Sequence, residues 1–161
     1  MLTTPAPTRI LSIAALLALA AGVAVADARR YCTGAPNSVG PGASIRWAGP
    51  FDPHGGQLRV EGCPPGQLGI FVYSLGAQDV PFGDGHLCVG PPAWALARTV
   101  TDARGRAGLD IWTEGEREDV RWIEFHHDLT WYFQLGYRDP AGPGGTGFNL
   151  SDALAVTFDP S

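Results

Sequence analysis

The chain has 161 residues and carries 16 acidic side chains against 11 basic ones, a formal net charge of −5 at pH 7. All the basic side chains are arginines, and they are scattered along the sequence. Nonspecific nucleic-acid binding requires clustered positive charge that neutralises phosphates, so we expect no nucleic-acid partner.

The first 26 residues have the pattern of a secretory signal peptide. Arg9 is the only charge before an apolar run from Ile10 to Val25, and the small-residue site Ala24–Ala26 precedes Asp27. The alternative is a membrane anchor, but a spanning helix requires about 18 or more apolar residues, and this run is shorter. We expect a leader helix that is cleaved after Ala26, a secreted (extracellular or periplasmic) location, and no membrane span in the mature chain.

Cleavage would leave residues 27–161, a length typical of one domain. The 22 glycines and 14 prolines separate short apolar or alternating runs at intervals of about ten residues, which is typical of a sandwich or barrel. We predict one all-β domain, an antiparallel β-sandwich (Ig-like or jelly-roll-like) of about eight strands. The expected strands are Ala43–Ala48, Gln57–Glu61, Leu68–Leu75, His86–Val89, Ala93–Thr101, Ala107–Thr113, Thr130–Arg138 and Ala153–Phe158.

Two of these strands have patterns that place them in the middle of a sheet. Aromatic and aliphatic residues alternate with more polar ones along Thr130–Arg138, so one face is apolar. Leu68–Leu75 is apolar at nearly every position, as in a strand covered on both faces. The acidic stretch Glu114–Asp128 is expected to be a long solvated connection, with or without one helical turn.

Three cysteines, Cys32, Cys63 and Cys88, would meet an oxidising compartment, where one disulfide and one leftover thiol are the simplest outcome. The residues alone leave all three pairings open. No neighbouring base marks a catalytic thiol, so we predict a structural role for the bridge.

Histidine is a candidate metal ligand or base at His126-His127-Asp128, with His54 and His86 as further donors. Adjacent side chains diverge on a strand and on a helix, which makes them poor chelating partners. We interpret these histidines as surface residues, with a metal site as the alternative.

Asp84 lies between two glycines and is a candidate ligand-binding residue. Turn-like acidic and amide residues can bind Ca²⁺ in secreted β-proteins, but they also favour turns by bonding their own backbone. We favour the turn interpretation and expect no required cofactor, with Ca²⁺ as the alternative. The other residues of this kind are Asp79, Asp139, Asn149 and Asp152.

The loop 142–147 is glycine-rich but lacks the Lys-Ser/Thr ending of a phosphate-binding loop, and we expect a flexible hairpin connection. No Gly-x-Ser-x-Gly nucleophile motif occurs. Aromatic residues could form a carbohydrate-stacking platform. Trp131 is expected in the core and Trp122 is the best exposed candidate among Trp47, Trp94, Trp112, Trp122, Trp131 and Tyr132.

An ordered series of short motifs resembles a large family of secreted domains in planctomycete and myxobacteria-like bacteria. The series covers nearly the whole mature chain and comprises Tyr31–Thr33, Pro36–Gly40, Gly69–Tyr73, Pro81–Val89, Trp131–Asp139 and Phe148–Leu154. The resemblance implies an all-β sandwich and no established activity. It also implies that Cys32 pairs with Cys88 and that Cys63 is the extra cysteine. A tryptophan of the family falls at or near Gly136 here, which departs from the pattern.

Gln134 and Arg138 are expected on one face of a central strand, with Asp139 at its end. We interpret these residues as satisfying buried backbone groups rather than forming a binding site. The sequence therefore favours a secreted, non-enzymatic envelope, matrix or adhesion-type module whose partner is a glycan or a cell-envelope protein. The alternatives are a carbohydrate-binding module, with or without Ca²⁺, and thirdly a glycan hydrolase that uses paired carboxylates.

Overall fold

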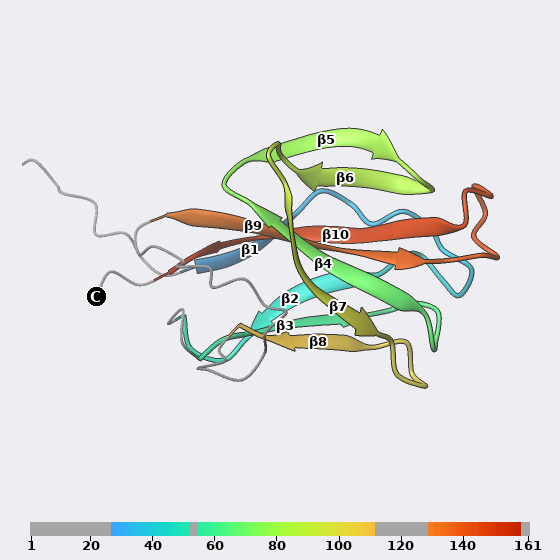
Figure 1. Ribbon diagram of the computed structural model, residues 1–161, viewed down its shortest axis with the longest axis horizontal. Coiled ribbons are helices and arrows are strands. Elements are labelled where there is room, and N and C mark those ends of the chain that lie inside the picture. The colour runs from blue at the N-terminus through green and yellow to red at the C-terminus, as the bar shows by residue number, and fades with distance from the viewer. Residues whose placement is uncertain (1–26, 52–54, 112–128, 159–161) are drawn as a thin grey trace, which may run out of the picture.

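The computed structural model describes residues 27–51, 55–111 and 129–158. Within these ranges the chain forms ten strands (Figure 1). They are β1 (Asp27–Tyr31), β2 (Ser44–Ala48), β3 (Gln57–Glu61), β4 (Leu68–Ser74), β5 (Ala77–Phe82), β6 (Gly85–Val89), β7 (Trp94–Val100), β8 (Ala107–Asp110), β9 (Thr130–Arg138) and β10 (Phe148–Thr157). The expected leader helix and the connection 114–128 lie outside the described residues. In the described ranges no helix is long and apolar enough to cross a membrane.

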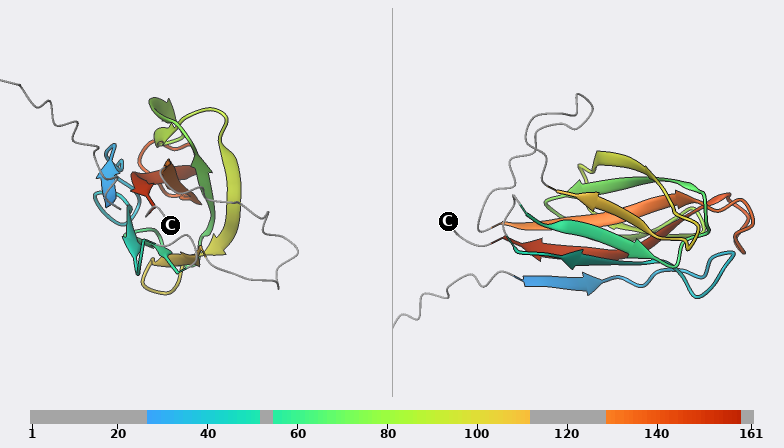
Figure 2. Two further views of the ribbon diagram at one scale, coloured as in Figure 1. Left: turned by 90° about the vertical axis from the view of Figure 1, so that its left-hand side faces the viewer. Right: turned by 90° about the horizontal axis from the view of Figure 1, so that it is seen from below.

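The strands form an antiparallel β-sandwich, as predicted. A five-stranded sheet has the order β1-β10-β9-β4-β7, and a three-stranded sheet has the order β2-β3-β8 (Figure 2). Every strand pair in both sheets is antiparallel. Strands β9 and β4 each have a neighbour on both sides, which confirms the prediction that they lie in the middle of a sheet.

The core lies between the two sheets and is formed by the inward side chains of both. On β9 the odd-numbered residues from Trp131 to Tyr137 point inward, since successive strand side chains alternate between faces. They pack with residues of the three-stranded sheet such as Ile45 and Leu58, which are 0 % exposed. Trp131 is buried, as the sequence predicted.

The hairpin β5–β6 covers part of the outer face of the five-stranded sheet (Figure 1). It lies over β10 and β9 and reaches only the end of β4, where Ser74 is buried. The start of β4 stays open, and Leu68 and Ile70 are 55 % and 42 % exposed. The expectation that this strand is covered on both faces was therefore wrong for its first half.

Two strands were not predicted, and one begins earlier than predicted. Strand β1 is polar at the sheet edge, and β5 is largely exposed, so neither shows an apolar alternation. Strand β10 begins at Phe148, five residues before the predicted start at Ala153. Its first half contains buried polar residues, Ser151 and Asp152 among them, which interrupt the apolar pattern.

Candidate functional site

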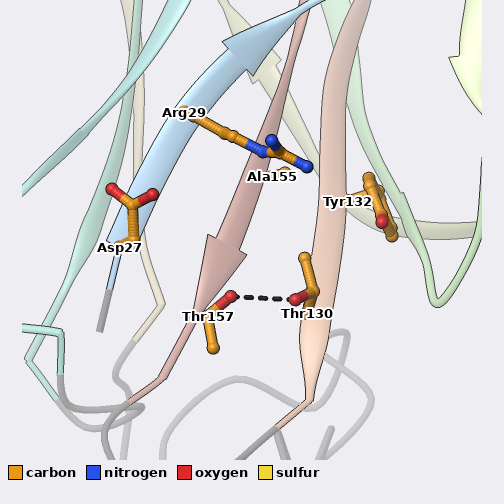
Figure 3. Close-up of a pocket in the computed structure, with 6 residues that line it drawn as sticks. All are labelled: Asp27, Arg29, Thr130, Tyr132, Ala155 and Thr157. Atoms are coloured by element: carbon orange, nitrogen blue, oxygen red, sulfur yellow. Dashed lines mark hydrogen bonds between the residues drawn. The ribbon is translucent and has the colours of Figure 1, made fainter. Parts of the chain in front are cut away.

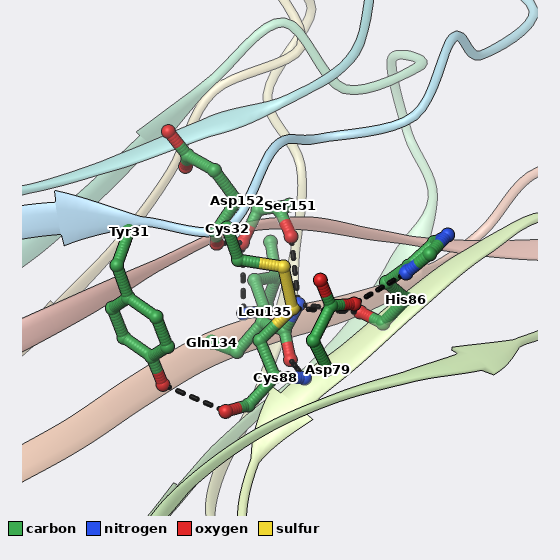
Figure 4. Close-up of a disulfide and its surroundings, with 9 residues drawn as sticks. All are labelled: Tyr31, Cys32, Asp79, His86, Cys88, Gln134, Leu135, Ser151 and Asp152. Atoms are coloured by element: carbon green, nitrogen blue, oxygen red, sulfur yellow. Dashed lines mark hydrogen bonds and ion pairs between the residues drawn. A yellow bond between two sulfur atoms is a disulfide. The ribbon is translucent and has the colours of Figure 1, made fainter.

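A disulfide joins Cys32, directly after β1, to Cys88 on β6 (Figure 4). The two Cα atoms are 6.4 Å apart and 56 residues apart in the sequence. The pairing that the resemblance implied is thus confirmed. Cys63 is free and buried, and burial raises the pKa of its thiol to about 12.

Gln134 connects three strands beside this disulfide (Figure 4). Its Oε1 accepts a hydrogen bond from the backbone N–H of Cys88 at 2.9 Å. Its Nε2 donates to the carbonyl oxygens of His86 and Ser151, both at 2.8 Å. The Gln134 side chain is 0 % exposed. It supplies hydrogen-bond partners to three backbone groups that the β5–β6 hairpin and the bulge in β10 leave without a partner on a neighbouring strand.

The bulge in β10 lies between Leu150 and Ala153, where one extra residue is inserted relative to β9. Ser151 Oγ accepts from the backbone N–H of Leu135 at 3.1 Å. Asp152 Oδ1 accepts from the backbone N–H of Ile45 at 2.6 Å, which ties β10 to β2 of the opposite sheet. Burial raises the pKa of the Asp152 carboxyl above its usual value.

Asp79 and His86 lie beside the disulfide (Figure 4). His86 Nδ1 is 2.5 Å from Asp79 Oδ1, and a carboxylate oxygen of Asp79 and both sulfurs lie within 4.8 Å of one another. Both sulfurs are bonded to each other, so in this form they are not free to bind a metal.

A shallow hollow of about 230 Å³ lies on the outer face of β1, β10 and β9 (Figure 3). Strand register builds it from two rows of side chains. The first row, across β1, β10 and β9, is Asp27, Thr157 and Thr130, and the second is Arg29, Ala155 and Tyr132.

Ala155 is the smallest of the six lining side chains and lies in the middle of its row, which leaves the space open. The Arg29 side chain extends across Ala155 toward Tyr132 (Figure 3). Thr130 and Thr157 share a hydrogen bond of 2.8 Å between their hydroxyls. The lining therefore offers a cation, a carboxylate, three hydroxyls and one aromatic ring.

Tyr31 supports the aromatic wall of the hollow from the next row. Its ring meets that of Tyr132 edge-on, with the centroids 5.4 Å apart. Its hydroxyl donates to the Cys88 carbonyl at 2.8 Å, and burial raises its pKa. The disulfide network and the hollow are consequently neighbours on one sheet face.

The remaining sequence candidates are placed as follows. Arg138 is exposed at the end of β9, and Asp139 follows it, fully buried. Asp84 lies in the β5–β6 turn and accepts hydrogen bonds from the loop 142–147. This loop joins the antiparallel strands β9 and β10, so it is a hairpin connection, and its flexibility stays a prediction. Trp122 and the cluster 126–128 lie outside the described residues, as do Trp112 and His54.

The sequence did not indicate the hollow. One residue in each row of three, Asp27 and Arg29, comes from β1, and that strand had not been predicted. The only available signal was the Asp27-Ala28-Arg29 alternation, which is too short to predict a strand.

Comparison of the chain with protein-family models, with curated proteins and with solved structures finds no match.

Proposed function

We propose that this protein is an exported, non-enzymatic β-sandwich of the adhesion or envelope type, and that it binds a glycan in the hollow of β1, β10 and β9. The observation that carries the proposal is the lining of this hollow. Sugars present hydroxyl groups that both donate and accept hydrogen bonds, together with apolar C–H faces.

The lining matches both features of a sugar. The Arg29 guanidinium donates, the Asp27 carboxylate accepts, and the Thr130 and Thr157 hydroxyls do either. The Tyr132 ring is amphipathic and suits a wet ligand face. Among the described residues neither Asp27 nor Arg29 forms an ion pair.

The size and charge of the hollow limit the kind of glycan that it can bind. A volume of about 230 Å³ is below the roughly 300–1,000 Å³ of pockets for drug-sized molecules, so one sugar unit of a longer chain fits better than a whole oligosaccharide. Asp27 and Arg29 have opposite charges and flank the same space, which favours a neutral sugar over a polyanion.

A glycan-array screen of the oxidised, leader-free chain tests the proposal. We expect saturable binding that Arg29→Ala and Tyr132→Ala each reduce at least tenfold. Arg98→Ala is the matched control, because Arg98 is an exposed arginine on β7 of the same sheet, away from the hollow. Absence of binding by the folded chain, or binding that Arg29→Ala leaves unchanged, would refute the hollow as a glycan site.

The second candidate is a cell-envelope protein partner. The open start of β4 favours it, since Leu68 pairs directly with Val100 on β7 and the two are 55 % and 58 % exposed. Together with Ile70 they form an apolar patch. If the folded chain binds no glycan on the array, envelope proteins that contact this patch become the candidate partners.

A further inference from the structure

Three loops meet at the end of β9 and β10 that is opposite the hollow (Figure 1). They are the β5–β6 turn with Asp84, the β9–β10 connection 139–147, and the segment around Ser38. Hydrogen bonds from Ser38 and Thr146 hold two aspartates at this corner, Asp139 and Asp84. The corner is distinct from the proposed glycan site.

Asp139 is buried, and no cationic side chain pairs with it among the described residues. Its side chain is 0 % exposed, and Oδ2 accepts a hydrogen bond from the backbone N–H of Ser38 at 2.9 Å. Its Oδ1 has no hydrogen-bond partner, and the carboxylate forms no ion pair, among the described residues. A buried carboxylate with an unpaired oxygen is unfavourable unless a positive charge compensates it.

Asp84 brings a second carboxylate to the same place. Its Oδ1 accepts from the backbone N–H of Thr146 at 2.9 Å and from the Thr146 hydroxyl at 2.6 Å, and Oδ2 accepts from the backbone N–H of Gly144 at 3.1 Å. The bonds from Thr146 lower the pKa of the Asp84 carboxyl below its usual value. Asp84 is therefore ionised at neutral pH.

Gly142 lies between the two carboxylates. A Cβ at Gly142 would lie under 3.0 Å from Oδ2 of both Asp84 and Asp139. The two oxygens are therefore less than 6.0 Å apart. Ca²⁺ binds oxygens at about 2.3–2.6 Å, so two ligands of one ion lie at most about 5 Å apart, a distance that a small loop adjustment provides.

We propose that this corner binds one Ca²⁺ ion, with Asp139 and Asp84 as its carboxylate ligands. The corner offers the carboxylate oxygens of Asp84 and Asp139 and the hydroxyl of Thr146, which are ligands of hard cations. Ca²⁺ fits better than Mg²⁺, because an irregular loop supplies variable geometry more readily than a strict octahedron. The ion neutralises the charge of Asp139 and links the hairpin turn to the β9–β10 connection.

Thermal unfolding of the oxidised, full mature chain tests the site. After treatment with EDTA, added CaCl₂ is expected to raise Tm by several degrees in a saturable way, and MgCl₂ by less. Isothermal titration with Ca²⁺ should give one site per chain.

Two variants and one control locate the ion. Asp84→Asn and Asp139→Asn should each abolish the Tm response. Asp102→Asn is the matched control and should keep the full response, because Asp102 also accepts two backbone N–H bonds in a turn, from Arg104 and Arg106, but faces no buried carboxylate in the described structure.

Asp139→Asn also distinguishes Ca²⁺ binding by Asp139 from a purely structural role of its carboxylate. The amide oxygen still accepts the Ser38 N–H, and the uncompensated charge is gone, so Tm in EDTA should equal or exceed that of the unsubstituted chain. Should this variant not fold, the exposed turn variant Asp84→Asn decides alone. The proposal is overturned if Ca²⁺ does not raise Tm of the unsubstituted chain, or if the response survives Asp84→Asn.

Discussion

Replacing Gln134 with leucine is expected to destabilise the domain strongly. The change keeps the approximate size of the side chain but removes all its hydrogen bonds. The N–H of Cys88 and the carbonyl of Ser151 would each lose a partner in a buried position, and the carbonyl of His86 would lose one in a part-buried position. An unpaired buried polar group costs about 1–3 kcal/mol, and partial entry of water reduces the sum, so we expect a loss of about 3–5 kcal/mol.

Equilibrium urea unfolding of the oxidised chain measures this loss. The midpoint should fall while the slope stays unchanged, because the substitution alters stability rather than the surface exposed on unfolding. Gln67→Leu is the matched control, since Gln67 is a half-buried glutamine whose side chain makes one long, exposed hydrogen bond of 3.4 Å, and its effect should stay within about 0.5 kcal/mol. If Gln134→Leu costs no more than this control, Gln134 does not fasten the hairpin to the sheet.

Three further predictions concern the cysteines and Asp152. Cys32→Ala with Cys88→Ala should lower stability by about 4 kcal/mol in urea unfolding, because a bridge across 56 residues restricts the unfolded chain, and a loss below 1 kcal/mol would contradict that account. Cys63 should not react with a thiol reagent in the native chain, since its thiol is buried with a pKa of about 12. After denaturation the chain should show one reactive thiol. Rapid labelling of the native chain would contradict the burial of Cys63. The raised pKa of Asp152 means that the folded chain holds this proton to a higher pH than the unfolded chain does. The free energy of unfolding should therefore fall as the pH rises from about 4 through the folded pKa, and Asp152→Asn should remove this pH dependence. Parallel curves of stability against pH for the two chains would contradict the assignment to Asp152.

The alternation of apolar residues predicted the parts of the fold that face the core. It placed β9 in the middle of a sheet with Trp131 inside, whereas β4 was placed there by its nearly continuous apolar run. The disulfide needed more than this pattern. The residues left three pairings open, and only the resemblance selected Cys32 with Cys88. The family itself stays a prediction.

The candidate sites could not be predicted because they depend on polar strands and on register. Strand β1 contributes Asp27 and Arg29 to the hollow, while its inward positions are Ala28 and Arg30. Arg30 Nη1 lies 3.6 Å from Asp152 Oδ2, so even this inward side has a charged residue. A strand with a polar outer row and a charged inner residue has no periodic apolar signal.

The same limit applies to the corner proposed for Ca²⁺. Asp84 and Asp139 were both candidates in the sequence, but 55 residues separate them, and turn chemistry explained each one alone. Their proximity follows from the hairpin folding back over β10, which places its turn beside the β9–β10 connection.

The extra residue at the β10 bulge determines which side chains reach the hollow. Before the bulge Leu150 pairs with Gly136, and after it Ala153 pairs with Gln134, so both lie on the outer face although their numbers differ in parity. If Ser151 and Asp152 each paired with a separate residue of β9 instead of sharing one position, Leu154 and Val156 would point outward, and Ala155 and Thr157 would enter the core.

Insertion of one glycine between Ala153 and Leu154 should therefore prevent folding, because it shifts the pairing of Leu154–Thr157 with β9 by one residue. A one-residue shift would expose Leu154 and Val156, which are 1 % and 0 % exposed now, and would bury Thr157 of the hollow. Circular dichroism and size-exclusion chromatography of this β10 insertion variant should show an unfolded or aggregated chain. Insertion of one glycine into the loop 142–147 is the control, since it adds length without changing register, and it should fold. A β10 insertion variant that folds with a native unfolding transition would mean that the strand accommodates the added residue, and the hollow would then not depend on this register.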